Sequence, residues 1–440
     1  MARPPIDRGE SDAVLELCRR KTETDYDCEY FYHYELDGER RLKNLFWADT
    51  DSGIDDIMGY GDVVVFDTTC RTNKHGVPFV PFVGLSPHRT PIVLGCGVTT
   101  DQSLDSLVWL LRAFKQSNHC RRDGPASVIT DDSNAVAGAI KTVFPGSNHR
   151  FCSWHVEQGI EEHLRGLSAA QNEFRALMCD DACSPTAFQD RWYGFMAKHR
   201  TAANLRRLDA MYDKREMWAA AFVHDKFFLG MANDQRTECL TTALHTGLHE
   251  GMSLTDLWRH ADACTHALRG DVAALDHQAA MSRLALTTEH RRLEERAARL
   301  FTPANFYLLR EEIKMLGSFD VLVETRGRHA ASGEVRYAVG FKERRGVVFD
   351  VERSGDDVLK CSCQKMERDG LPCRHIFCVM RHASMSQIPA CCALGRMQRR
   401  LDAKCERLEE MKDLGRLVFD LASEDAKEFQ EIMKFFQTWL

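Results

Sequence analysis

The sequence contains no run of about eighteen apolar residues, which is the shortest stretch that crosses a bilayer as a helix. Its first twenty residues, MARPPIDRGESDAVLELCRR, also lack the apolar segment of a secretory signal. These two absences predict a soluble, intracellular protein with no membrane partner.

The pattern of a disulfide-stabilised protein is missing as well. The 17 cysteines are odd in number and are scattered through a long chain that shows no export signal. We therefore expect most of them to be buried thiols and a few to be metal ligands.

An excess of positive charge is absent, since the net charge is -7 at pH 7. Nucleic-acid-binding domains usually carry a basic excess on at least one face, so any contact with DNA is expected to be a local patch. What the chain does have is an apolar share of 44% over 440 residues. That is enough for two or three globular domains with buried cores.

The composition of the first half of the chain changes near Gly61, from mixed and polar to strongly apolar. Residues 1–58 are predicted to be a polar lead-in, with one strand pair around the turn at Asp37-Gly38. Residues 59–155 contain three apolar, β-branched runs, DVVVFDTT, PFVPFVGLS and PIVLGCGV, which predict neighbouring strands. A helix, the short strand SVITD, a second helix and the strand HRFC follow, so the predicted order is β-β-β-α-β-α-β.

Helical periodicity dominates the middle of the chain. Residues 156–234 have apolar positions three and four apart and are predicted to form a helical insertion. Helical character returns over 235–316, with breaks expected near Gly247–Gly251 and at Thr302-Pro303.

In the last part of the chain, short apolar runs alternate with turn-forming residues. Residues 317–390 contain FDVLVE, EVRYAVGF, GVVFDV and DVLKCSC, which predict a small antiparallel sheet followed by a short helix. Residues 391–440 are predicted to be a charged helical tail.

Two aspartates lie where predicted strands end. Asp67 belongs to the first apolar strand and Asp131 follows the fourth, so neighbouring strands would bring them together. A buried aspartate is costly unless it is paired, and two Mg²⁺ ions relieve the repulsion of such carboxylates and clamp a phosphodiester. Glu238, on a later helix, offers a third carboxylate. The alternative is that both aspartates terminate strands and that Glu238 is a solvated charge.

Four metal-binding side chains lie close together near residue 370. Two cysteines spaced two apart in a strand face the same side, and Gly370-Leu371-Pro372 turns the chain back toward them. The following helix then supplies a cysteine and a histidine, which completes a closed Cys₃His set suited to structural Zn²⁺. Cys378, one turn later, is expected in the core. The predicted zinc ligands are Cys361, Cys363, Cys373 and His375.

Two further clusters have competing interpretations. His149, Cys152 and His155 are spaced too closely for the paired ligands of a structural zinc site, so a packed junction between a strand and a helix is the alternative. A basic helical stretch is interleaved with glutamates, which favours a solvated, salt-bridged face over a DNA contact. Its basic residues are Arg283, His290, Arg291, Arg292, Arg296 and Arg299, and its acidic ones are Glu289, Glu294 and Glu295.

Longer stretches resemble a known family. VVVFDTTCRTNKHGVPFVPFVGLSPHRTPIVLGCGV and VITDDSNAVAGAIKTVFPGSNHRFCSWHV are similar to the Mutator-like transposase domain of the plant far-red-impaired-response and far-red-elongated-hypocotyl family. RLKNLFWADTDSG and CSCQKMERDGLPCRHIFCVM match the same family, so the resemblance covers roughly residues 15–400.

The resemblance implies an α/β fold. Its parts are an RNase H-like DDE transposase core with a helical insertion and a small β-rich SWIM-type zinc module, which contains the CxCx(n)CxH pattern. Asp67, Asp131 in TDxxxA and Glu238 in RTE then correspond to the DDE triad. Cys152 and His155 correspond to a Cys-x2-His element that lies beside the active site in such transposases.

This sequence departs from the family pattern at three positions. Cys70 and His75 stand where tyrosines are common, and Ser133 stands where a second aspartate often follows Asp131. The serine removes one possible auxiliary metal ligand.

Many members of the family are domesticated as transcription factors. The resemblance therefore implies a nuclear, DNA-associated regulator of transcription of the light-signalling type, with DNA and homo- or hetero-oligomers of related proteins as partners. The family's N-terminal zinc finger is not matched, because only Cys18, Cys28 and His33 precede the core. Truncation or a partner that supplies DNA specificity would account for this.

Two other functions stay open. One is an active transposase that cuts and joins DNA with two Mg²⁺ or Mn²⁺ ions held by Asp67, Asp131 and Glu238. The other is a truncated interaction module that binds intact family members.

Overall fold

The computed structural model describes most of the chain, with some gaps. The described ranges are 6–24, 28–51, 60–117, 123–180, 183–223, 225–231, 236–326, 334–342, 347–355, 358–385 and 387–399, with 415, 427, 429–431, 433 and 434 beyond them. Within these ranges the side chains of residues 24, 28, 29, 50, 51, 236–239 and 326 are outside the description. Most of the predicted helical tail therefore lies outside the described residues, apart from short 3-10 turns at Ala390–Cys392 and Gly395–Met397.

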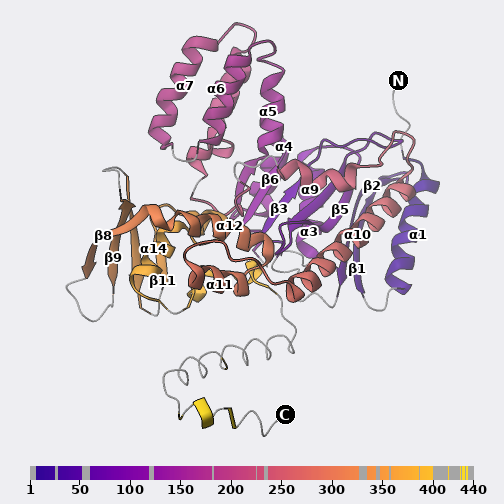
Figure 1. Cartoon of the computed structure of the whole chain (residues 1–440). Coiled ribbons are helices and arrows are strands. Elements are labelled where there is room, and N and C mark those ends of the chain that lie inside the picture. The colour runs from indigo at the N-terminus through magenta and orange to yellow at the C-terminus, as the bar shows by residue number, and fades with distance from the viewer. Residues whose placement is uncertain are drawn as a thin grey trace.

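A seven-stranded mixed sheet forms the centre of the molecule (Figure 1). Its strands lie in the order β1-β2-β5-β4-β3-β6-β7, with parallel pairs only at β3-β6 and β6-β7 among those described. The predicted order β-β-β-α-β-α-β is confirmed from β3 to β7. The strands are β1 (Cys28–Leu36), β2 (Leu42–Asp51), β3 (Val63–Phe66), β4 (Phe79–Leu85), β5 (Pro91–Thr99), β6 (Ser127–Thr130) and β7 (Asn148–Phe151), with α3 (Leu104–Gln116) and α4 (Asn134–Val143) between them.

The predicted lead-in is part of this sheet rather than a separate segment. Its strand pair is confirmed as the antiparallel hairpin β1-β2, and β2 also pairs with β5. In β2 both faces are buried, with Leu45 and Trp47 in one core and Phe46 in the other. Helix α1 (Arg8–Thr24), which the sequence analysis did not predict, contributes Cys18 to the first of these cores.

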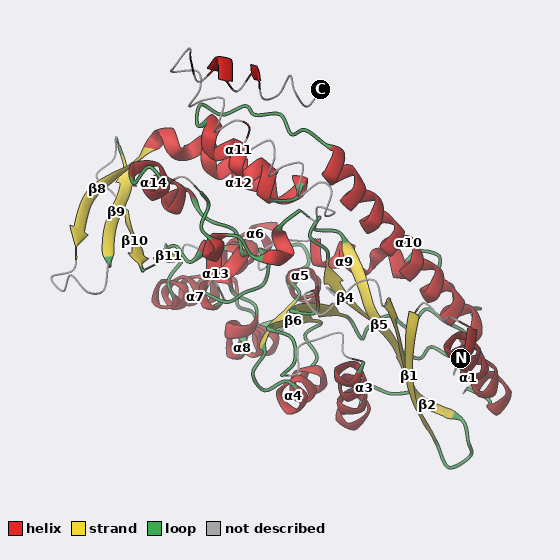
Figure 2. Ribbon diagram, turned by 90° about the horizontal axis from the view of Figure 1, so that it is seen from below, coloured by secondary structure: helices red, strands yellow, loops and turns green. Residues whose placement is uncertain are grey.

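Each face of the sheet is covered by helices, which explains why the central strands β3, β4 and β5 are almost wholly apolar. Alternate residues of β3 enter different cores: Val63 and Val65 face one side, and Val64 and Phe66 face the other. Helices α3 and α4 cover the second side. Helices α1, α9 (Arg236–His245) and α10 (Leu254–Met281) cover the first, and the long α10 runs along it in Figure 2.

A helical unit with its own core is inserted after β7. Its side chains include the fully buried Phe174, Trp192 and Trp218, which pack on one another. In Figure 1 these helices extend away from the sheet. They are α5 (Ser153–Glu161), α6 (Ser168–Cys179), α7 (Pro185–His199) and α8 (Leu205–Asp213).

The helical return is broken at both predicted places. Helix α9 ends before the glycine-containing turn, and α11 (Arg291–Leu300) ends before Pro303 begins α12 (Pro303–Lys314). The interruption between α10 and α11 was not predicted. Among the described residues, no helix combines the length and apolar character needed to cross a bilayer.

The predicted antiparallel sheet near the C-terminus is confirmed. Four strands lie in the order β11-β10-β9-β8, with helix α14 (Arg374–His382) against one face. A short helix, α13 (Lys365–Asp369), occupies the segment between the two pairs of predicted zinc ligands. The strands are β8 (Phe319–Arg326), β9 (Val335–Phe341), β10 (Val348–Ser354) and β11 (Val358–Cys361).

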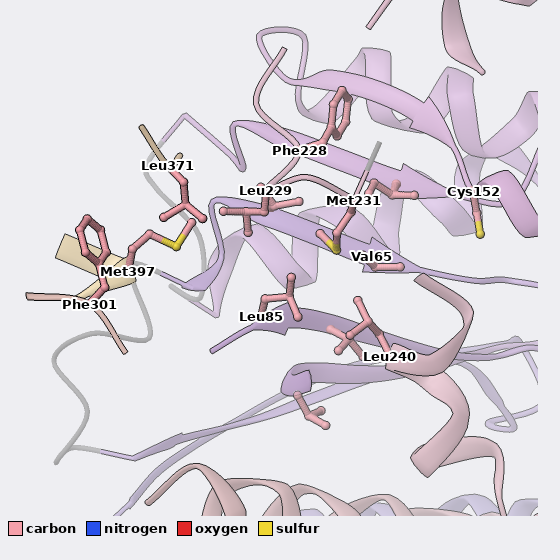
Figure 3. Close-up of a cluster of buried hydrophobic side chains, with 14 of the residues drawn as sticks. Val65, Leu85, Cys152, Phe228, Leu229, Met231, Leu240, Phe301, Leu371 and Met397 are labelled. Carbon is pink, nitrogen blue, oxygen red and sulfur yellow. The ribbon is translucent and has the colours of Figure 1, made fainter. Parts of the chain in front are cut away.

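One apolar core joins this module to the large sheet. Figure 3 shows Leu229 and Met231, which precede α9, between Val65 of the sheet and Leu371 of the module. The backbone N–H groups of Phe228 and Gly230 donate to the carbonyl of Arg368, at 3.2 and 3.4 Å. The two parts therefore share their interior.

Gly95 tests the packing of the core between the large sheet and helices α3 and α4. A Cβ atom at Gly95 would lie 2.5 Å from the ring of Phe46, which is fully buried. We expect Gly95→Ala to lower the free energy of unfolding by about 1–3 kcal/mol because the core is overpacked. Urea denaturation measures this. Gly146→Ala, with no atom within 4 Å of the added Cβ, is the control, and equal stability of the two variants would contradict the packing.

Candidate functional site

Parallel pairing of β3 with β6 brings the two aspartates together. Val63 is opposite Ser127 and Val65 is opposite Ile129, so continuing the register places Asp67 opposite Asp131. Neighbouring strands lie about 4.8 Å apart. The alternation of side chains also puts both positions on the face covered by α9, because Val65 and Ile129 belong to the same core.

Asp131 is buried, and its carboxylate accepts three hydrogen bonds. Its Oδ2 accepts hydrogen bonds from the backbone N–H of Thr68 at 2.9 Å and from the Thr68 hydroxyl at 2.8 Å. Its Oδ1 accepts one from the N–H of Ser133 at 3.0 Å. With only 3% of the residue exposed, the carboxylate ties the end of β3 to the start of α4.

Asp67 is more accessible and lines a cavity of about 420 Å³. Its two oxygens accept hydrogen bonds from the N–H and hydroxyl of Thr69, at 2.8 and 2.9 Å. His155 Nε2 lies 3.5 Å from Asp67 Oδ2. Burial alone would raise the pKa of Asp67 and lower that of His155. Their mutual attraction outweighs burial, so the pKa of Asp67 is lowered and that of His155 is raised to about 10.

Cys152 and His155 also line this cavity, at the start of α5. Cys152 is the buried N-cap residue of the helix. His149 lies apart, because its Nε2 is 2.8 Å from the Thr130 hydroxyl, and burial lowers its pKa to about 4. No metal-ligand cluster of these three residues occurs in the described part of the chain.

Helix α9 closes the cavity with Thr241, Thr242 and His245. The sequence analysis did not select His245. Its Nε2 is buried and has no hydrogen-bond partner among the described residues, and burial lowers the pKa of His245. The signal that could have found it is its position two helical turns after Glu238, on the same face of the helix.

The side chain of Glu238 lies outside the described residues. Its backbone belongs to α9, which contacts β3 and β4. The helical period places position 238 on the face that carries Thr241, Thr242 and His245 toward the cavity.

The described carboxylates do not fit a pair of hard cations as they stand. Mg²⁺ and Mn²⁺ require carboxylate oxygens that are open to the ion. Asp131 is buried and already accepts three hydrogen bonds, and Asp67 faces the positively charged ring of His155.

The predicted zinc ligands do converge. One ligand atom from each of Cys361, Cys363, Cys373 and His375 lies within 4.8 Å of the others. Cys361 Sγ is 3.6 Å from His375 Nδ1. Bond lengths of about 2.3 Å to sulfur and 2.1 Å to nitrogen give a tetrahedron edge of about 3.6 Å, so these residues fit structural Zn²⁺ bound through Nδ1.

The surroundings of the zinc site are rigid. The His375 ring stacks on Phe349 with a centroid distance of 3.9 Å, which fixes its orientation. Gly370, at φ 72°, ends α13 in the left-handed region, and a Cβ there would lie 3.0 Å from both Leu394 and Met397. Cys378 is fully buried and outside the ligand cluster, as predicted.

The basic stretch is only partly a salt-bridged face. Arg299 pairs with Glu295 at 3.0 Å, as expected for residues four apart. Glu294, in contrast, is fully buried and accepts hydrogen bonds from the backbone of Thr287 and Thr288. It closes the loop before α11, and in the described part of the chain it forms no ion pair with the arginines of this stretch.

Comparison with known proteins supports both units. The chain matches the MULE transposase domain over residues 63–159 and the SWIM zinc finger over residues 347–383. Three similar proteins are from Arabidopsis thaliana. Protein FAR1-RELATED SEQUENCE 5 is 27% identical over 87% of this chain and 48% of its own length. Protein FAR1-RELATED SEQUENCE 7 is 28% identical over 83% and 46%, and Protein FAR-RED IMPAIRED RESPONSE 1 is 25% identical over 87% and 46%.

These matches confirm the resemblance to the far-red-impaired-response family. The chain spans about half the length of the curated relatives it matches.

Cysteine substitution tests the zinc site. We expect the purified chain to hold about one Zn per molecule and Cys373→Ser to lose it, because three ligands hold Zn²⁺ less tightly than a closed set of four. Mass spectrometry of metal content after dialysis against a chelator measures this. Cys378→Ala, on the same helix, should keep its zinc. Full zinc content in Cys373→Ser would refute the ligand assignment.

Proposed function

We propose that this chain, a relative of the far-red-impaired-response family, is a transposase-derived protein that associates with DNA in the nucleus and regulates transcription. Its large sheet domain serves as a scaffold and as a platform for oligomers with itself or related proteins. The zinc module adds a contact surface for DNA or protein.

The proposed scaffold is an RNase H-like core. Support comes from the strand order β5-β4-β3-β6-β7, in which two antiparallel pairs are followed by two parallel pairs, with helices on both faces. The match to the MULE transposase domain covers β3 to α5 of this unit.

One observation favours a scaffold over an enzyme. Asp131, whose carboxylate would be central to a DDE site, accepts hydrogen bonds from Thr68 and Ser133 within the fold. A retained acidic residue at this position is therefore explained by stability alone.

The second candidate, an active transposase, is favoured by the shared cavity. Asp67 lines it, and the face of α9 on which position 238 lies closes it. The third, a module that binds intact relatives, is compatible with the chain covering about half of their length.

Replacing Asp131 separates a structural carboxylate from a catalytic one. We expect Asp131→Asn to lower the free energy of unfolding by about 1–3 kcal/mol, since an amide N–H₂ would replace an acceptor that faces a donor. Urea denaturation at neutral pH measures this. Asp209→Asn is the control, because this position is exposed and its side chain makes no ion pair or hydrogen bond with the residues that the structure describes. A stabilised Asp131→Asn would instead indicate relief of repulsion with Asp67, as in a metal site.

A nicking assay tests the rival directly. We expect the zinc-loaded protein with Mg²⁺ or Mn²⁺ to nick supercoiled DNA no faster than Asp67→Asn does, because the described carboxylates are not open to two ions. Agarose gels give the rates. Metal-dependent nicking that both Asp67→Asn and Asp131→Asn abolish would overturn the scaffold proposal.

Chromatin occupancy tests the proposed role itself. The tagged protein should be nuclear and should occupy discrete chromatin sites. If relatives supply DNA specificity, occupancy should fall when they are removed. Exclusion from the nucleus, or no enrichment on chromatin in the presence of relatives, would contradict the proposal.

A further inference from the structure

A positively charged cavity lies between α11 and α14, outside the carboxylate site. Its volume is about 390 Å³, and it is lined by residues at the start of α11 and at the end of α14. Helix α14 is the helix that begins at the zinc ligands Cys373 and His375. The lining residues with charge are Glu289, His290, Arg291, Arg292, Arg296 and Arg381.

The arginines of this cavity are unevenly neutralised. Arg291 and Arg292 are exposed, and within the described part of the chain their side chains make no hydrogen bond or ion pair. Arg296 donates to the carbonyl of Met385 at 2.9 Å. Arg381 donates to the carbonyls of Leu316 and Phe319, and it lies 3.3 Å from Asp320. Glu289 is the single acidic residue that lines the cavity.

Nearby positive charges help to lower the pKa values of two groups that line this cavity. The pKa of Arg296 is lowered first by burial and then by the charges of Arg292 and Arg299. Burial and the charge of Arg381 likewise lower the pKa of His290. A bound anion would relieve this repulsion.

We propose that this cavity, with Arg291 and Arg292 at its rim, binds the phosphate backbone of duplex DNA. The inference rests on the proposed function, since it names a surface through which a DNA-associated protein would hold its partner.

Geometry and charge favour a nucleic-acid backbone as the partner. The guanidinium fork matches phosphate oxygens, and the ten residues of α11 extend about 15 Å, along which a duplex presents several phosphates. The net charge of -7 confines any such attraction to a local patch. Leu293, Ala297 and Ala298 of α11 are buried, so the helix offers no apolar face for insertion into an anionic membrane.

The test uses the zinc-loaded chain of 440 residues and a fluorescein-labelled duplex of about 30 base pairs. Fluorescence anisotropy over a salt series gives Kd and its salt slope. Arg291→Gln/Arg292→Gln should weaken binding by about tenfold near 0.1 M salt and lower the slope by about two, one for each lost phosphate contact. Arg112→Gln/Lys141→Gln is the matched control, since these are two exposed cations across the sheet that make no ion pair among the described residues.

Three outcomes decide the proposal. Weakened binding in the first variant and unchanged binding in the control support it. Equal binding by wild type and Arg291→Gln/Arg292→Gln overturns it and leaves the proposed function standing. Failure of the wild type to bind duplex, with Arg291- and Arg292-dependent binding to phosphatidylserine vesicles, shows that the partner class is wrong. Chromatin occupancy then judges the proposed function separately.

Discussion

The parallel pairing of β3 with β6 determines the geometry of the carboxylate site. It places Asp67 and Asp131 at one edge and on one face of the sheet, and it lets Thr68 and Ser133 hydrogen-bond to the Asp131 carboxylate. Ser133 also accepts a hydrogen bond from the N–H of Val136 and so caps α4. Ser133, which departs from the family pattern, thus has a local structural role. The Asp131 carboxylate connects the end of β3 to the start of α4.

The shared apolar core gives the zinc module a second role besides contact with partners. Cys373 is the N-cap of α14, and the next turns of this helix bury Ile376, Phe377 and Val379 completely. That interior continues through Leu371 to Leu229 and Met231, directly before the segment that leads to α9. Metal binding is folding free energy for such a module, so bound Zn²⁺ would stabilise the part of this shared core that the module contributes.

Much of this could be predicted because local spacing determines it. The order of elements along the chain from β3 to β7, the antiparallel module and the convergence of the four predicted zinc ligands follow from periodicity and from ligand spacing. The membership of β1 and β2 in the main sheet could not, because pairing between distant strands leaves no local pattern.

Tertiary contacts explain the other differences. Glu294 is a charged residue in a helical repeat and looks solvated, yet the loop at Thr287 and Thr288 buries it. His245 lines the same cavity as Asp67 because α9 packs on β3, and this packing is a tertiary contact. Whether Asp131 is a structural residue or a metal ligand depends on the hydrogen-bond donors of Thr68, at the end of β3. Composition does not reveal that these donors face Asp131.

Under the scaffold proposal, hydrogen bonds within the fold hold the carboxylates at the β3-β6 edge without metal ions. Electron paramagnetic resonance of Mn²⁺ titrated into the zinc-loaded protein tests it most directly, since free and bound Mn²⁺ give distinct signals. We expect the same weak binding in wild type, Asp67→Asn and Asp131→Asn. Tight Mn²⁺ binding by the wild type that disappears in both variants would contradict it.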